Sequence, residues 1–349
     1  MSLHLLKDIK VTGKTVFVRL DLDIPLSETQ NIEDDTRLRS CLPTIEYLLK
    51  QNCKVTIGGH LGRPKGVEGS LSLEPVAKWF QNKFSISNLQ FSKRGGFEGW
   101  EIGSNLFLLE NLRFYDGEET NDEEFSKKLA NLSDIYVNDA FAMCHRNHAS
   151  IAGITKFLSH FAGFHLEKEV ENLTRAMENP KRPLIVIIGG KKIETKLPMV
   201  EKMHRIADYV LVGGKIAEES QAFLKVRHEK IIGRKSVLLV ADLTADGMGI
   251  TEKSLYNFLE IIPMAKTIIW NGSMGFIAEK EDQFEATRKI AKAIIASKAY
   301  SVVGGGDTVE FLNRLGILNK FSFASTGGGA MLAFLSGEKL PGLVVLEKS

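Results

Sequence analysis

Basic and glycine-rich segments recur at corresponding places in the two halves of this 349-residue chain. In the first half, cationic side chains follow short apolar runs: Arg37, His60, Arg63, Arg113 and Arg146. The planar guanidinium of arginine donates two parallel hydrogen bonds to a phosphate or a carboxylate. Four arginines supplied by four separate loops therefore predict a pocket for an anionic ligand.

In the second half, glycines follow the apolar runs. The clusters are Gly189-Gly190, Gly213-Gly214, Gly272 with Gly275, Gly304-Gly305-Gly306 and Gly327-Gly328-Gly329. Glycine allows a backbone to approach a ligand closely, and the N–H groups that begin the next helix can bind phosphate oxygens. Lys192 and Lys196 are four residues apart, and so would share one helix face. Asp307 follows the triple glycine, where a carboxylate could hold the magnesium of a nucleotide.

Each of these features has a structural alternative when it is considered alone. A glycine pair after a strand is usually a turn, Asp307 would also suit a helix cap, and a lysine pair is often a solvated helix face. His145 and His148 are spaced like two ligands of a metal, but no third ligand accompanies them. The joint pattern favours ligand binding, because all the clusters follow apolar runs. No P-loop motif and no GxGxxG after a strand is present, so neither a P-loop enzyme nor a dinucleotide oxidoreductase is indicated.

Parallel strands must position these residues. Ten apolar runs are predicted as strands: 14–22, 54–59, 105–110, 134–139, 183–190, 209–214, 236–242, 267–272, 300–306 and 321–326. Runs that are apolar throughout are typical of strands buried on both faces, and the segments between them have helical patterns. This alternation predicts an α/β fold with parallel sheets, in which ligands bind beyond the carboxyl ends of the strands.

The length of the chain predicts two domains. Residues 164–178 form one long, charged amphipathic pattern that Asn179-Pro180 ends, and we interpret it as an interdomain helix, although a surface helix of one domain would look similar. The expected division is an anion-binding domain over 1–163, a connecting helix over 164–180 and a glycine-loop domain over 181–336.

The composition excludes several classes of protein. A hydrophobic content of 44%, a charged content of 25% and a net charge of +2 are typical of a globular protein and do not indicate nucleic acid or a membrane as partner. The three cysteines, Cys41, Cys53 and Cys144, are too far apart to indicate a disulfide framework or a zinc site. Neither a signal peptide nor a span of roughly 20 apolar residues is evident, so a cytoplasmic protein is expected.

Nine segments, taken in order, resemble the successive motifs of phosphoglycerate kinases. They are VRLDLDIPL, DDTRLRSCLPTI, GHLGRPKG, LLENLRFYDGEE, YVNDAFAMCHRNHAS, GGKKIETK, WNGSMG, GGGDT and STGGGAM, and the match runs from about Val18 to Gly342. The resemblance implies two Rossmann-like domains and reversible phosphoryl transfer between 1,3-bisphosphoglycerate with ADP and 3-phosphoglycerate with ATP, as in glycolysis and gluconeogenesis. A carboxylate is already a nucleophile, so such a reaction needs positioning and charge neutralisation but no general base.

The resemblance also implies roles for individual residues. The 3-phosphoglycerate site of domain 1–163 would consist of Asp21, Asp23, Arg37, His60, Arg63, Arg113 and Arg146. Around the transferring phosphoryl group, the catalytic residues would be Arg37, Lys192, Gly328 and Gly329. The ATP or ADP site would comprise Gly190, Lys196, Gly213, Gly214, Gly275, Gly305, Gly306, Asp307, Thr308 and Gly327, with Asp307 as the Mg²⁺ ligand. Residues 337–349 would return to the first domain, the two domains would close for transfer, and the protein would be a monomer with small-molecule partners only.

The sequence departs from the family pattern at several places. Asp23 replaces the usual asparagine, so a second carboxylate would lie beside that of the substrate and repel it. On the nucleotide side, Lys215 replaces a glycine, Ser273 a proline and Ala278 a glutamate, and the segment 221–266 is shortened by roughly two elements. We therefore expect ordinary binding of phosphates and loose or altered recognition of the base.

Two other functions remain open at this stage. Asp23 favours an enzyme that acts on another anionic acid or turns over 3-phosphoglycerate weakly. The shortened nucleotide side favours a binding or regulatory protein, but the retention of Arg37, Lys192 and Asp307 counts against it.

Overall fold

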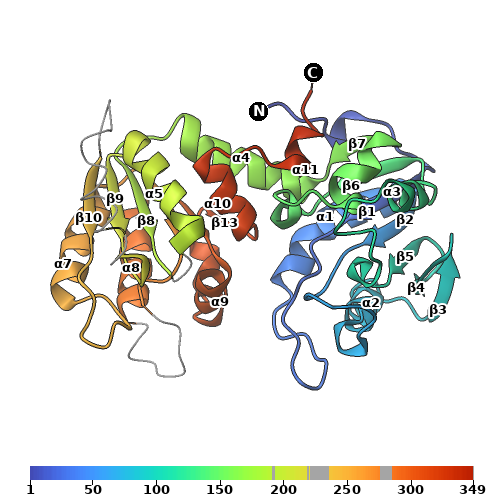
Figure 1. Cartoon of the computed structure of the whole chain (residues 1–349), viewed down its shortest axis with the longest axis horizontal. Helices are drawn as coiled ribbons and strands as arrows, with labels where there is room; N and C mark the ends of the chain where they lie inside the picture. The colour runs from blue at the N-terminus through green and yellow to red at the C-terminus, as the bar shows by residue number, and fades with distance from the viewer. Residues whose placement is uncertain (191–192, 218–219, 221–235, 276–284, 349) are drawn as a thin grey trace. The chain divides into compact units, whose positions relative to one another are not determined.

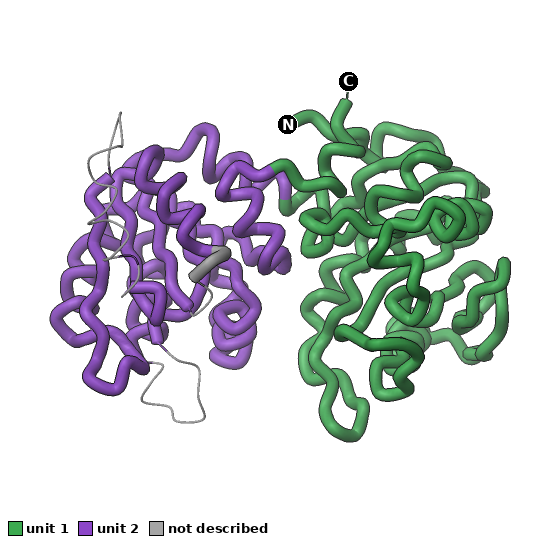
Figure 2. The backbone as a smooth tube through the Cα atoms, viewed as in Figure 1, with its two compact units in different colours: residues 1–169, 339–349 green, residues 170–338 purple. Residues whose placement is uncertain are grey.

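The computed structural model describes residues 1–190, 193–217, 220, 236–275 and 285–348, with the side chains of 193–195 also left out. The chain forms two compact units (Figure 2). Unit 1 comprises Met1–Glu169 and Lys339–Ser349, and unit 2 comprises Val170–Glu338. The helix α4 (Phe164–Glu178) contains the boundary between Glu169 and Val170.

Unit 1 is built on a seven-stranded sheet in the order β3-β4-β5-β2-β1-β6-β7 (Figure 1). The strands are β1 (Thr15–Arg19), β2 (Lys54–Gly58), β3 (Leu89–Arg94), β4 (Phe97–Ile102), β5 (Leu106–Leu109), β6 (Ile135–Asn138) and β7 (Ser159–Ala162). The interior strand β1 is parallel to β2 and β6, with Arg19 opposite Gly58 on one side and opposite Asn138 on the other. The chain therefore leaves these three strands at one edge of the sheet.

The strands β3, β4 and β7 were not among those predicted. The sheet is mainly parallel, as predicted, and the exception is β4. It pairs antiparallel with both β3 and β5. The turn between β3 and β4 is made by Gly95 and Gly96, whose φ angles of 58° and 88° lie in the left-handed region that favours glycine. Most residues of β3 are exposed or half-buried, so its sequence lacks the continuous apolar run by which the other strands were predicted.

Helices cover both faces of this sheet. They are α1 (Thr36–Lys50), α2 (Glu74–Lys83), α3 (Glu123–Ala130) and α11 (Pro341–Val344), together with the first residues of α4. Because successive side chains of a strand point to opposite faces, Val16 and Val18 pack in one core cluster and Phe17 in another. The helix α3 begins at a capping residue, since the Asp122 carboxylate accepts a hydrogen bond from the backbone N–H of Phe125 at 2.7 Å.

The last residues of the chain belong to unit 1. The backbone N–H of His4 donates to the carbonyl oxygen of Leu346 at 2.8 Å, and that of Lys348 donates to Ser2 at 2.9 Å. The N–H of Gly342 donates to the carbonyl oxygen of Cys144 at 2.9 Å. The C-terminal segment thereby joins the N-terminal segment beside the sheet.

Unit 2 contains a six-stranded sheet in the order β10-β9-β8-β11-β12-β13, and all its pairings are parallel. The strands are β8 (Leu184–Ile188), β9 (Tyr209–Val212), β10 (Val237–Val240), β11 (Thr267–Asn271), β12 (Tyr300–Gly304) and β13 (Phe323–Ala324). The helices are α5 (Ile193–Ile206), α7 (Glu252–Ile261), α8 (Glu285–Ser297), α9 (Gly306–Arg314) and α10 (Gly329–Ser336), with the rest of α4. All ten predicted strands are present across the two units, and the predicted α/β class is confirmed.

No helix in the described part of the chain is long and apolar enough to cross a membrane.

Candidate active site

The cationic residues of unit 1 follow the carboxyl ends of its parallel strands. Asp21 and Asp23 follow β1, and His60 and Arg63 follow β2. Arg113 lies in a 3-10 turn after β5, Arg146 follows β6, and Arg37 lies in the first turn of α1.

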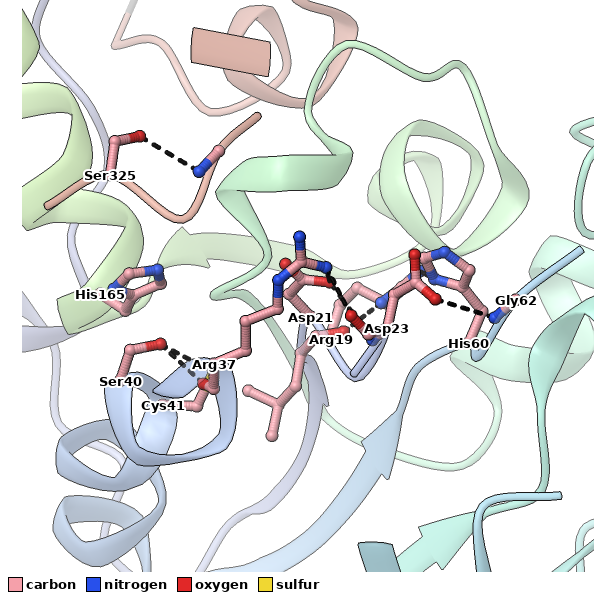
Figure 3. A network of polar contacts seen from close by, with 12 residues as sticks. Arg19, Asp21, Asp23, Arg37, Ser40, Cys41, His60, Gly62, His165 and Ser325 are labelled. Carbon is pink, nitrogen blue, oxygen red and sulfur yellow. Dashed lines mark hydrogen bonds and ion pairs between the residues drawn. The ribbon is translucent and has the colours of Figure 1, made fainter. Parts of the chain in front are cut away.

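Arg37 is held by the segment that follows β1 (Figure 3). Its Nη1 donates to the carbonyl oxygen of Asp23 at 2.6 Å and to Oδ1 of Asp21 at 3.3 Å. Asp21 is only 2% exposed, so burial raises the pKa of its carboxyl group, while the adjacent Arg37 opposes that shift. Among the described residues, the second amine of the Arg37 guanidinium has no hydrogen-bond partner, so it can donate to a ligand.

The loop that carries His60 and Arg63 is fixed at the peptide groups of Gly62. The Gly62 N–H donates to Oδ1 of Asp23 at 2.9 Å, and its carbonyl oxygen accepts from Nη1 of Arg113 at 2.6 Å. Asp23 is exposed and accepts this hydrogen bond as the amide oxygen of an asparagine would. The departure from the family pattern therefore preserves the loop contact and adds a negative charge.

The cations of unit 1 act on one another electrostatically. Burial lowers the pKa of His60 well below its usual value, and the charges of Arg19, Arg113 and Arg37 lower it further. Burial also lowers the pKa of His148 to about 4, with contributions from Arg19, Arg113 and Arg146. Arg63 is exposed and repels the half-buried Arg113. The four predicted arginines are thus brought into one positively charged region, beside a His60 ring whose lowered pKa leaves it uncharged.

Two residues of this region were missed by the sequence analysis. Arg19 ends β1 and is 0% exposed, and its guanidinium contacts Ser150 and His60. Glu118 is also 0% exposed and accepts hydrogen bonds from Ser150. An arginine that ends an otherwise apolar run, as in TVFVR, was the available signal for the first. No local signal marks Glu118 as buried.

The glycine loops of unit 2 pack closely against one another. A Cβ atom on Gly214 would lie 2.6 Å from the backbone nitrogen of Gly190, and one on Gly272 would overlap the carbonyl oxygen of Gly189. The N–H of Gly213 donates to the carbonyl oxygen of Ile188 at 2.9 Å. Glycine is required at these positions by contacts between the loops.

Two other glycines face open space. Among the described residues, no atom beyond the neighbouring residues and the helix's own backbone lies within 4 Å of a Cβ built on Gly306, which begins α9, or on Gly328, which precedes α10 with a φ angle of 47°. Asp307 is exposed in the first turn of α9, and the buried hydroxyl of Thr308 has no hydrogen-bond partner among the described residues. Helix N-termini with free N–H groups and open space can bind phosphate.

The remaining predicted residues of unit 2 differ in their burial and in their hydrogen bonds. Lys196 is 7% exposed, and its ammonium donates to the carbonyl oxygen of Gly189. The hydroxyl of Ser273 donates to the carbonyl oxygen of Gly275 at 2.8 Å, and the N–H of Gly327 donates to Ser325 at 3.1 Å. Lys215 is exposed, whereas Gly305 is half-buried with a φ angle of 95°. Lys192 and Ala278 lie outside the described residues.

Comparison with known proteins gives the family. The model described as "Phosphoglycerate kinase" matches residues 6–243 and 235–338. The chain belongs to the phosphoglycerate kinase family. A phosphoglycerate kinase of Dictyoglomus turgidum is 38% identical over 388 residues, covering 98% of each chain. The cytosolic phosphoglycerate kinase 3 of Arabidopsis thaliana is 37% identical over 398 residues, covering 100% of this chain and 99% of the relative.

Solved phosphoglycerate kinase structures are similar over nearly the full chain. The enzyme from Coxiella burnetii has a TM-score of 0.81 and 32% identity, covering 99% of this chain and 98% of its own. The enzyme from Pyrococcus horikoshii has a TM-score of 0.82 and 31% identity, covering 98% of each. Both the sequence match and the fold therefore extend across units 1 and 2.

This chain is a shortened member of the family, as predicted. The alignment with the Dictyoglomus turgidum relative covers 388 residues, whereas the chain has 349, so at least 39 positions have no counterpart here. The two stretches matched by the family model meet at 235–243, within the segment 221–266 that was expected to be short. In this segment, the Asp246 carboxylate accepts hydrogen bonds from the Thr244 hydroxyl at 2.5 Å and the Met248 N–H at 3.0 Å, within its own turn.

Proposed function

We propose that this chain is an active kinase that transfers a phosphoryl group reversibly between ATP and the carboxylate of 3-phosphoglycerate. The observation that carries the proposal is the positively charged region of unit 1, which has the chemistry to bind an acid with two anionic groups. The full-length family membership supports the same reaction. The comparisons give no support to either of the two alternatives that the sequence left open.

In this proposal, the acid binds to unit 1. Arg63 and Arg146 are exposed, and so can donate to the phosphate or carboxylate of the substrate in pairs of hydrogen bonds. Arg113 and the Asp23 carboxylate hold Gly62, which keeps the loop of His60 and Arg63 in place before the substrate arrives. The other proposed substrate residues are Asp21, which orients Arg37, and Arg37 itself, which faces the transferring group.

The nucleotide phosphates bind to unit 2 in this proposal. The open N-termini of α9 and α10, at Gly305-Gly306 and Gly327-Gly328-Gly329, supply backbone N–H groups. The described residues contain no cluster of three metal-binding side chains. Mg²⁺ usually takes one or two carboxylates with phosphate oxygens and waters, and Asp307, exposed in the first turn of α9, is the residue that would hold it. Bound there, Mg²⁺ would neutralise charge on the phosphates.

Positioning and charge neutralisation account for the catalysis. The acid needs no general base, because its carboxylate is already ionised and nucleophilic. Arg37 and Lys192 neutralise the charge on the transferring group, and the N–H groups of Gly328 and Gly329 donate to its oxygens. Lys196 fixes the first glycine loop through the Gly189 carbonyl. The nucleotide site is lined by Gly190, Gly213, Gly214 and Gly275. The hydroxyl of Thr308 is available to hydrogen-bond to the nucleotide phosphates. The proposed partners are small molecules. We also place the enzyme in the cytoplasm, because the Arabidopsis thaliana relative is named as a cytosolic protein.

A coupled assay of the purified protein with ATP, Mg²⁺ and 3-phosphoglycerate tests the proposal. We expect turnover that falls by a factor of about 100 or more in Lys192→Ala, because one catalytic charge or donor typically contributes that much. Lys298→Ala, in the turn before β12, is a matched control that should keep the wild-type rate. Turnover that is absent, or that does not depend on Lys192, would reject the proposal in favour of a binding protein.

A further inference from the structure

Four polar side chains form a buried cluster beneath the cationic region of unit 1. Arg19, Glu118 and Ser150 are 0% exposed and His60 is 2% exposed. They come from β1, the segment after the 3-10 turn Leu112–Phe114, a π-helical turn (Ala149–Gly153) and the loop after β2. Burying two charges is unfavourable unless they are paired and hydrogen-bonded, so the contacts within this cluster are strongly constrained.

Glu118 sets the direction of the Ser150 hydroxyl. Its carboxylate accepts from the backbone N–H of Ser150 at 3.0 Å and from the Ser150 hydroxyl at 2.5 Å. A hydroxyl has one hydrogen, so the oxygen of Ser150 is left as an acceptor, and Nε of Arg19 donates to it at 2.8 Å. The hydroxyl of Tyr136 donates to the Ser150 carbonyl oxygen at 2.7 Å and holds this turn from the other side.

Arg19 in turn sets the tautomer of His60. Its Nη2 lies 3.1 Å from Nδ1 of His60. Arginine has donors only and remains protonated in proteins, so Nδ1 of His60 must be the acceptor. The nearby charges of Arg19, Arg113 and Arg37, with His148, disfavour a second proton on the ring. The single imidazole hydrogen is therefore on Nε2, for which the described residues provide no hydrogen-bond partner.

We infer that Arg19, Ser150 and Glu118 are positioning residues that hold His60 neutral with its proton on Nε2, so that the ring presents an N–H donor to the anionic acid. The inference rests on the proposed function for the identity of that acid. The opposite tautomer would direct a lone pair at an anionic oxygen, which is repulsive. Glu118 also balances the charge of Arg19, so that the arginine can be buried beside a ring that must stay neutral.

The tautomer can be measured without any activity assay. In the full-length protein labelled with ¹⁵N-histidine, His60 should show the nitrogen shift of an unprotonated Nδ1 and a protonated Nε2. The chain has eight histidines. The ¹⁵N signals of His60 are identified as those that are missing from the spectrum of the His60→Gln variant. A protonated Nδ1, or a ring that is charged near pH 7, overturns the inference even if the enzyme is fully active.

A paired variant tests the positioning role. Arg19→Met combined with Glu118→Gln removes both buried charges together, so that neither is left unpaired. We expect a mixture of His60 tautomers, a KM for 3-phosphoglycerate raised 10- to 100-fold, and kcat and the KM for ATP changed much less. The matched control is Arg94→Met with Glu101→Gln, which removes a half-buried ion pair of the β3–β4 hairpin and should leave all these values unchanged.

The outcomes separate this inference from the proposed function. If the paired variant keeps the wild-type His60 spectrum, or if its KM for 3-phosphoglycerate is unchanged, the inference is wrong. If the paired variant does not fold, Arg19→Lys takes its place, because one ammonium cannot reach both Ser150 and His60 as the guanidinium does, and the same two results decide. An inactive wild-type protein rejects the proposed function, whereas the His60 spectrum and a titration with 3-phosphoglycerate still decide the inference.

Discussion

Replacing Asp23 by asparagine should improve the use of 3-phosphoglycerate. Asp23 is exposed, and Oδ1 of its carboxylate accepts one hydrogen bond from the Gly62 N–H at 2.9 Å. An asparagine side chain can accept the same hydrogen bond, and the contact of Arg37 with residue 23 uses the backbone carbonyl oxygen. The substitution therefore removes a negative charge without removing a contact.

The size of the effect follows from Coulomb's law. Two unit charges about 5 Å apart repel by about 0.8 kcal/mol in water and by about 3 kcal/mol at the effective dielectric constant of a protein surface. Because Asp23 is exposed, a value between these limits applies, and we take about 1 to 2 kcal/mol. Such an energy corresponds to a KM for 3-phosphoglycerate that is about 5 to 30 times lower in Asp23→Asn.

Steady-state kinetics with varied 3-phosphoglycerate, at saturating ATP and Mg²⁺, measures this change. The improvement should shrink as salt is added, since an exposed charge is screened. Glu124→Gln is the matched control, because it removes one exposed carboxylate from α3 of the same unit and should leave KM unchanged. An Asp23→Asn enzyme with an equal or higher KM would refute the electrostatic reasoning and leave Asp23 with its role in holding Gly62.

Three further predictions concern the nucleotide side and stability. Calorimetry should give dissociation constants for ADP and GDP that agree within about tenfold, and it should also detect binding of pyrophosphate. Tight binding that is selective for adenine would contradict the expected loose recognition of the base. Gly328→Ala and Gly316→Ala, both at a positive φ beside open space, should each lower the free energy of unfolding by about 1 kcal/mol. Only Gly328→Ala should also raise the KM for ATP, at least tenfold; equal kinetics for the two variants would remove Gly328 from the nucleotide site. Burial lowers the pKa of His165 to about 4 in the folded protein, so His165 takes up a proton at a higher pH in the unfolded chain. The free energy of unfolding should therefore drop by as much as about 3 kcal/mol between pH 6.5 and 4. His165→Gln should flatten this dependence in denaturant titrations, and an unchanged slope would show that His165 titrates normally.

The sequence by itself determined the class of fold and the types of residue in the site. The ten predicted strands are continuous apolar runs, which can be recognised locally because a strand buried on both faces needs them. The β3–β4 hairpin escaped prediction because β3 (Leu89–Arg94) is exposed or half-buried throughout, and both strands mix polar with apolar residues. Arg37, Arg63, Arg113 and Arg146 could be predicted because each follows an apolar run, at the edge where parallel strands end.

Only the tertiary structure decided which of these groups act on one another. Arg19 contacts Ser150, which is 131 residues away in the chain, and Ser150 contacts Glu118, 32 residues away. The glycine clusters look alike in sequence, yet Gly214 is required by loop packing and Gly306 faces open space. Residue type and local periodicity are written along the chain, whereas burial, pairing of charges and the tautomer of a histidine depend on neighbours that only folding brings together.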